Sequence, residues 1–152
     1  HGTRGINQTF NQSSHSDNNE FITFRNENTQ IGSITAPNSS SIAFNTSSDY
    51  RLKENVTYTW DATTRLKQLK PARFNWIADS SNTLEDGFLA HEVQTVVPNA
   101  ITGAKDQTED YLDDEGKTQQ RILPQKIDYS KLVPLLVKTI QELEARITTL
   151  EG

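Results

Sequence analysis

The sequence contains no cysteine, so no disulfide can support the fold and no zinc site with cysteine ligands can form. No apolar run approaches the roughly 20 residues that cross a bilayer, and the N-terminus lacks the basic-then-apolar pattern of a signal peptide. The 15 lysines and arginines are outnumbered by 20 aspartates and glutamates, for a net charge of -5, and no basic stripe follows one face. We therefore expect neither a membrane partner nor nucleic-acid binding.

Hydrophobic residues are also scarce. They make up 33% of the 152 residues, and the mean hydropathy is -0.70. This length suits one small domain with an extension, but the composition is lean for a chain that must bury its own core. Association between copies of the chain would supply the missing burial. The composition thus favours an oligomer.

Residues 1–47 hold two arginines, no lysine and many Asn, Ser and Thr residues. The strand-like runs in this part are residues 21–25, residues 30–35, and residues 41–45, which follow the breakers Pro37 and Asn38. Short strands with few large apolar side chains bury little when folded alone. We predict an intertwined β segment completed by other copies of the chain, with a disordered polar linker as the alternative.

Residues 48–128 have the composition of a small mixed α/β domain. The predicted elements are a short helix capped by Asp61, a strand with Phe74 and Trp76, a turn at Asp86 and Gly87, a helix with Val93, Val96 and Val97, and a hairpin with the tip DDEG at 113–116.

Two acidic features of this domain need interpretation. The cluster of Asp110, Asp113, Asp114 and Glu115 lacks the alternating carboxylates of a calcium loop, so we interpret it as a solvated turn and predict no metal site. His91 and Glu92 are adjacent on a predicted helix and therefore point in different directions, which disfavours an acid/base pair.

Residues 129–152 carry the clearest periodicity in the chain. Apolar residues recur at spacings of 3, 4, 3, 4 and 3, at Val133, Leu136, Ile140, Leu143, Ile147 and Leu150. This heptad seam predicts a helix that associates with identical helices in a parallel coiled coil, and packing on its own domain is the alternative. In this seam Val or Ile occupies heptad position a and Leu occupies position d, a pattern that favours a coiled coil of two helices.

Ser48 precedes Lys53 by five residues in the stretch SSDYRLKEN. A serine before a charged run is an ordinary helix N-cap. The same residues could instead form a nucleophile and its base, with the lysine amine taking the serine proton. A lysine is charged at neutral pH, so this role requires desolvation or a neighbouring cation, for which Arg51 is a candidate. The residues alone leave both interpretations open.

Four blocks occur in a fixed order: NTSSDYRLKENV at 45–56, LKPARFNW at 69–76, DGFLAHEVQTVVP at 86–98, and DYSKLVPLLVKTIQELEARI at 128–147. Together they resemble the self-cleaving C-terminal intramolecular chaperone domains of bacteriophage tailspikes and tail fibres, best known from endosialidases. The resemblance implies a homotrimer that assembles the β-rich fibre preceding it in the same chain. It implies that assembly takes place in the host cell cytoplasm and that the mature fibre lies in the virion tail. It thus implies a coiled coil of three helices, whereas the heptad pattern favours two.

The resemblance also implies autoproteolysis by a serine-lysine dyad. The family's Ser-Asp-x-x-Leu-Lys pattern falls on Ser48, Asp49, Leu52 and Lys53. The chain would then be a single-turnover serine endopeptidase without a cofactor, with Ser48 and Lys53 catalytic and cleavage within Ser47, Ser48 and Asp49. Attack of Ser48 on its own carbonyl would close a four-membered ring, attack on the Ser47 carbonyl a five-membered one, and attack from a neighbouring protomer neither.

The expected fold is therefore α+β. It comprises an N-terminal intertwined β segment as the end of a fibre, a small chaperone and autoprotease domain, and a C-terminal coiled-coil helix, with predicted bounds 1–47, 48–128 and 129–152. A permanent trimeric fibre tip that never cleaves is the rival interpretation. It would use the same seam and strands and differ only at the dyad.

Overall fold

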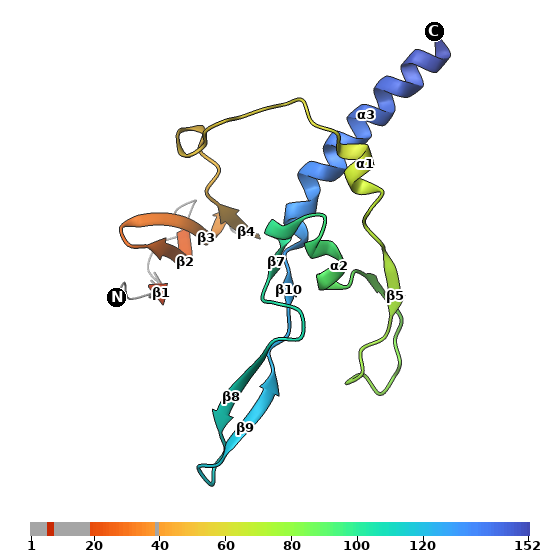
Figure 1. Cartoon of the computed structure of the whole chain (residues 1–152). Helices are drawn as coiled ribbons and strands as arrows, with labels where there is room; N and C mark the ends of the chain where they lie inside the picture. The colour runs from red at the N-terminus through yellow and green to blue at the C-terminus, as the bar shows by residue number, and fades with distance from the viewer. Residues whose placement is uncertain (1–5, 8–18, 39) are drawn as a thin grey trace. The chain divides into compact units, whose positions relative to one another are not determined.

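The computed structural model describes residues 6–7, 19–38 and 40–152 and divides the chain into two compact units, His1–Thr57 and Tyr58–Gly152 (Figure 1). The turn that carries Ser48 and Lys53 belongs to the first unit. No helix in the described part of the chain is long and apolar enough to span a membrane.

The first unit is a four-stranded antiparallel sheet whose strands follow one another in sequence order. The strands are β1 (Ile6–Asn7), β2 (Asn19–Asn26), β3 (Thr29–Asn38) and β4 (Ser41–Thr46). β2 and β3 are joined by a tight turn in which Glu27 has a φ of 52°. The three predicted strands are thus present, and the alternative of a disordered linker does not describe residues 19–38 and 40–46.

Pro37 does not end its strand, contrary to the sequence-based expectation. β3 continues to Asn38, but its pairing with β4 becomes irregular at this point, passing from Thr35 opposite Ala43 to Asn38 opposite Ser41. A proline has no amide hydrogen to donate to the partner strand. Where the pairing is irregular, no such hydrogen bond is required of it. The breaker therefore distorts the pairing and leaves the strand intact.

One face of this sheet is apolar and largely uncovered. The register places Ile22 opposite Ile34 and Ile34 opposite Phe44, so these side chains share a face. Phe44 is 80% exposed and Ile42, two residues before it, is 61% exposed. The buried side chains of the sheet's described part are instead polar, at Thr23 and Ser33. The sheet therefore lacks an apolar core of its own.

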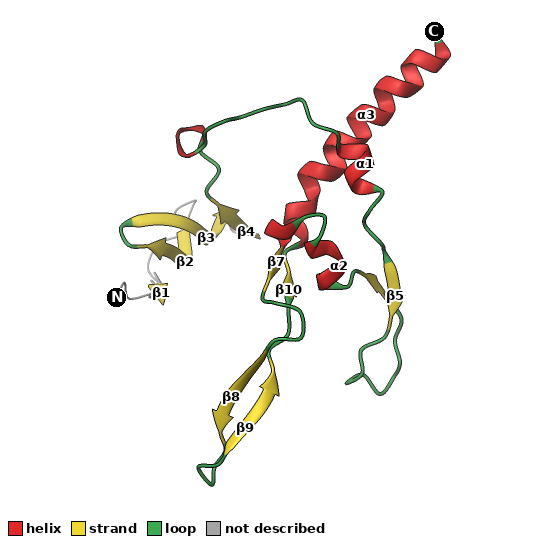
Figure 2. Ribbon diagram, viewed as in Figure 1, coloured by secondary structure: helices red, strands yellow, loops and turns green. Residues whose placement is uncertain are grey.

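The second unit contains three α-helices and three two-stranded ribbons within long connecting segments (Figure 2). The helices are α1 (Ala62–Leu66), α2 (Ala90–Gln94) and α3 (Val133–Glu151). The ribbons pair β5 (Ala72–Phe74) with β6 (Glu85–Gly87), β7 (Ile101–Thr102) with β10 (Lys126–Ile127), and β8 (Thr108–Leu112) with β9 (Thr118–Ile122). Short 3-10 turns occur at Tyr50–Leu52, Pro98–Ala100 and Tyr129–Leu132. The predicted α+β class is confirmed.

The core of the second unit lies where α1, α2 and the start of α3 meet. Its buried hydrophobic residues are Ala62, Val93, Val96, Val97, Ala100, Leu132 and Leu135. The three valines are those that the sequence placed at helical spacing. Six partly buried hydrophobic residues pack around this cluster: Trp60, Leu66, Leu69, Phe88, Ile101 and Ile127.

The turn predicted at Asp86 and Gly87 is wrong, because both residues lie in β6. Asp86 stands opposite Arg73 and forms an ion pair with it at 2.7 Å, an interaction across strands that a pattern of neighbours does not reveal. Gly87 is required for space: a Cβ there would lie 3.1 Å from the ring of Phe74 and 3.1 Å from the hydroxyl of Tyr129. The glycine permits close packing and does not mark a turn.

The predicted hairpin is present as β8 and β9. At its tip, Asp113 accepts hydrogen bonds from the backbone amides of Glu115 and Lys117 and from the side chain of Gln119, which is the first cause of its lowered pKa. The Asp113 carboxylate thus closes the turn, in agreement with the interpretation of the acidic cluster as a turn.

A carboxylate from α3 ties the N-terminus of α1 to that helix. Glu142 accepts hydrogen bonds from the amides of Ala62 (3.0 Å) and Thr63 (2.8 Å) and from the Thr63 hydroxyl (2.6 Å). Asp61 accepts from the amide of Thr64, as predicted for the cap. First-turn amides have no partner within their own helix, so the two carboxylates satisfy them. The Thr63 hydroxyl, followed by the two amides, holds the pKa of Glu142 below its usual value of 4.5.

The lowered pKa of Glu142 predicts a pH-dependent contribution to stability. Because the folded-state pKa is lower than the unfolded one, the carboxylate stabilises the fold above pH 4.5, and this contribution is lost as the pH falls through the folded-state pKa. We expect E142Q to unfold at lower urea concentration than the parent at pH 7, and the difference to close as the pH is lowered. Urea titrations at fixed protein concentration measure it.

The matched control is E144Q, an exposed position on the same helix, which should show no such difference. A destabilisation of E142Q that stays constant down to low pH would contradict the assignment of this pKa effect.

Candidate active site

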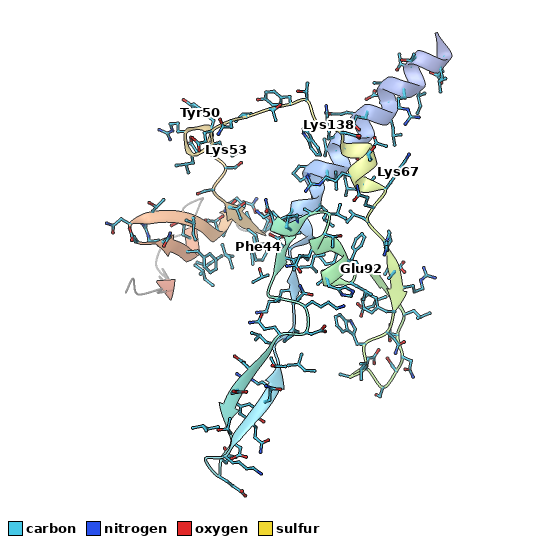
Figure 3. The ribbon with its side chains drawn as sticks, in the orientation of Figure 1. Phe44, Tyr50, Lys53, Lys67, Glu92 and Lys138 are labelled. Atoms are coloured by element: carbon cyan, nitrogen blue, oxygen red, sulfur yellow. The ribbon has the colours of Figure 1, made fainter. Side chains whose placement is uncertain are left out.

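Ser48 and Lys53 are in direct contact. The Lys53 Nζ lies 2.7 Å from Ser48 Oγ and also donates to the Ser48 carbonyl oxygen at 3.0 Å. Figure 3 places Lys53 on the turn that follows β4. The shorter distance is within the range for direct proton transfer between a hydroxyl and an amine. The arrangement therefore provides the contact that a nucleophile and its base need.

The contact is made by a short 3-10 turn, Tyr50–Leu52, between the two residues. The N-cap of this turn is Asp49, whose carboxylate accepts from the amide of Arg51 at 2.8 Å. The N-cap interpretation of Ser48 therefore does not match the structure, since its hydroxyl contacts Lys53 and the neighbouring aspartate caps the turn. The turn reverses the chain so that Lys53 reaches back to Ser48.

Arg51 does not act as a free cation beside Lys53. Its guanidinium forms an ion pair with Asp49, with Nη2 2.7 Å from Oδ2 and Nε 3.0 Å from Oδ1. The hydrogen bonds from Arg51 are the main cause of the lowered pKa of Asp49, to which the charge of Lys53 adds. Asp49 thus neutralises the cation that the sequence suggested as a neighbour of the lysine.

Both members of the pair are exposed in the single chain. Ser48 and Lys53 face solvent, and so do the apolar side chains of Tyr50 and Leu52 on the turn between them. Water can therefore reach the amine and the hydroxyl. Desolvation of the lysine, which general-base chemistry requires at neutral pH, is not provided by the fold of one chain.

Ser47 is anchored to the sheet on the N-terminal side of the dyad. Its amide donates to the Ile31 carbonyl at 3.1 Å, and its hydroxyl donates to the Gln30 carbonyl at 3.0 Å. These bonds prolong the pairing of β3 with β4 by one residue. The peptide bond between Ser47 and Ser48 therefore lies where the sheet ends and the turn that carries Ser48 and Lys53 begins.

Glu92, the acidic candidate beside His91, has a structural partner. Glu92 accepts from Lys70 at 3.1 Å and so pairs across the second unit (Figure 3). In the described residues, no three His, Asp or Glu side chains come close enough together to hold a metal ion.

The predicted seam of α3 remains uncovered along the whole helix. Its six residues, Val133, Leu136, Ile140, Leu143, Ile147 and Leu150, are between 42% and 86% exposed. The second unit packs instead against a different face of the same helix, which carries Leu135, Thr139 and Glu142 and continues from Leu132 in the preceding turn. The seam is therefore not used for packing within the chain.

The sequence did not lead us to predict this second face, although its residues recur at spacings of 3, 4 and 3, each one position before a seam residue. Its last two members are polar, and the regular apolar seam beside it gave the stronger signal. Glu142 in particular carries no sequence feature that predicts contact with residues 62 and 63. Only the tertiary contact identifies it.

Part of the chain matches a known protein family. Residues 48–102 match the model of the peptidase S74 family, described as the chaperone of endosialidase. The match begins at Ser48 and includes the second and third sequence blocks, whereas the block at 128–147 lies beyond it. The chain has no match among curated proteins. The resemblance stated from the sequence is thus confirmed for this segment.

The uncovered seam predicts that association and folding can be separated. We expect I140E/L143E to abolish oligomers while the second unit keeps its secondary structure, because both side chains are exposed in the single chain. Light scattering and circular dichroism measure the two properties. L135E is the contrasting variant: Leu135 is only 3% exposed, so its replacement should unfold the unit. An I140E/L143E protein that remains oligomeric would contradict this role of the seam.

Proposed function

From the match of residues 48–102 to the family of the chaperone of endosialidase, we propose that the chain is an intramolecular chaperone that cuts itself free. It trimerises through the α3 seam, assists assembly of a bacteriophage tail fibre or tailspike that precedes it, and then cleaves the chain at Ser48. The strongest support for the cleavage step is the 2.7 Å contact between Lys53 Nζ and Ser48 Oγ, at the first residue of the matched segment.

The proposed reaction uses the neutral amine of Lys53 as the base. Ser48 Oγ transfers its proton to Nζ as it attacks a backbone carbonyl carbon, and the C–N bond breaks as the nitrogen takes up the proton. The product is an ester, which water hydrolyses to a carboxylate and a free Ser48 hydroxyl. Attack on the Ser47 carbonyl would pass through a five-membered ring, and the anchoring of Ser47 to β3 holds that carbonyl beside the turn.

Assembly supplies what the single chain lacks. Both dyad residues are exposed in one chain, and apolar Tyr50 and Leu52 on the same turn are exposed with them. Packing of further copies over this turn would remove water from Lys53 and favour its neutral form. An unassembled chain would then stay intact, and cleavage would follow assembly.

The chaperone role has a physical basis in the first unit. The apolar face of the sheet, with Ile42 and Phe44, is uncovered in one chain and would be buried when copies stack. Such contacts form between chains, so each chain loses conformational entropy before any contact compensates for it. Linking the strands to a trimerising helix raises their local concentration and sets their register.

The rival function is a permanent, non-cleaving fibre tip. It uses the same seam and the same sheet, so only the fate of the chain distinguishes it from the self-cleaving chaperone. A tip has no need of the lysine-serine contact, which is the observation that favours the chaperone.

Cleavage by the dyad predicts the behaviour of three variants on a denaturing gel. We expect the parent to yield a fragment of about two thirds of the 152 residues, and S48A and K53A to remain intact while still forming trimers. S80A, which removes an exposed serine in the loop between β5 and β6, is the matched control and should cleave like the parent. Efficient cleavage of S48A would refute the dyad, and a parent that stays intact would favour the permanent tip.

Dependence of cleavage on assembly is tested with the variant that lacks the seam. I140E/L143E should stay uncut as a monomer, because no second copy covers Lys53. Its cleavage rate is compared with that of the parent across a range of protein concentrations. A monomer that is cut at the parental rate would show that the dyad is active without desolvation by other chains.

A further inference from the structure

The geometry of the dyad depends on how tightly the chain turns between its members. Lys53 lies five residues after Ser48, and both residues that flank the turn have extended backbone, with ψ values of 135° at Asp49 and 140° at Lys53. The reversal is therefore confined to the three residues Tyr50–Leu52. Because 3-10 turns of this length have poor hydrogen-bond geometry, they need additional stabilisation.

Asp49 supplies that stabilisation from both its backbone and its side chain. Its carbonyl accepts from the Leu52 amide at 3.2 Å, and its carboxylate accepts from the Arg51 amide at 2.8 Å. The Lys53 amide then donates to the Tyr50 carbonyl at 3.1 Å. The side chain of Asp49 thus satisfies the amide of Arg51, in the middle of the turn.

The Arg51 side chain keeps the carboxylate in this position. Its Nε and Nη2 bind the two oxygens of Asp49, so the hydrogen bonds that the carboxylate accepts all come from Arg51. Lys53 directs its Nζ to Ser48 alone, to the hydroxyl and the carbonyl. The two cations of the turn therefore have separate partners, and the dyad lysine is not drawn into an ion pair with Asp49.

We propose that Asp49 is a positioning residue of the self-cleavage reaction, holding the turn that brings Lys53 Nζ to Ser48 Oγ while contacting neither atom itself. This inference rests on the proposed function, since it concerns the geometry of the same dyad. It assigns the carboxylate a capping role, which an asparagine oxygen can also fill, and no role in proton transfer.

Rescue by asparagine distinguishes capping from charge. Asparagine and aspartate are equally good N-caps, whereas alanine cannot accept a hydrogen bond. In the full chain we expect D49A to cleave about tenfold more slowly than the parent and D49N to recover most of that loss. D79A is the matched control, because Asp79 accepts from the Ser81 amide at 2.9 Å in the same i to i+2 pattern, in the loop between β5 and β6. It should cleave like the parent.

Two outcomes of the rate measurement would overturn the inference. A D49A protein that cleaves at the parental rate shows that the cap is not needed. A D49N protein as slow as D49A shows that the charge is needed, which capping does not explain. In either case S48A, run alongside, shows separately whether the dyad performs the cleavage.

A readout that does not depend on cleavage separates this inference from the proposed function. In the S48A background, D49A should raise the hydrogen-exchange rates of the Arg51, Leu52 and Lys53 amides, measured by NMR, and D49N should leave them close to those of S48A alone. Unchanged exchange in D49A would refute the capping role even if cleavage were slower. Faster exchange in D49A with rescue by D49N would support it even if the parent chain proved to be uncut.

Discussion

The small amount of apolar surface that one chain can bury is the constraint on which the structure depends. In the described part of the chain, the buried hydrophobic cluster contains no residue larger than leucine. Many other apolar side chains lie exposed instead, on the uncovered sheet face around Phe44 and along the seam of α3. An apolar face contributes to stability only when something covers it. The groups that leave a single chain poorly packed are therefore those available for association.

The same constraint bears on chemistry. The turn between Ser48 and Lys53 sets the distance between hydroxyl and amine within one chain, but it leaves both in water. Geometry and desolvation are thus separate requirements. Under the proposed function, the single chain provides the geometry and the assembled copies provide the desolvation. Hydrolysis of a peptide bond in water has no easy reverse, so a fibre released in this way would be kinetically trapped in its assembled form.

The sequence predicted features that depend on neighbours along the chain. The strands of the first unit, the cap at Asp61, the core valines and the uncovered seam all follow from local patterns, and so did the pairing of Ser48 with Lys53 once the family was recognised. Prediction from the sequence failed where a contact between residues far apart in the chain determines the local structure. Asp86 lies in a strand that pairs with residues 72–74, where Arg73 stands opposite it, and Glu142 caps a helix formed 79 or 80 residues earlier. Such contacts join residues whose proximity is created by folding itself.

The contact of Glu142 with α1 also sets an order of events during synthesis. The core of the second unit begins at Ala62 but is completed by Leu132 and Leu135, and its helix cap comes from residue 142. Contacts of such long sequence separation cannot form until the later residues have left the ribosome. A chain whose translation stops before α3 therefore cannot close this core. The fold thus depends on translation through α3, and only a chain extended through α3 can present a seam to its partners.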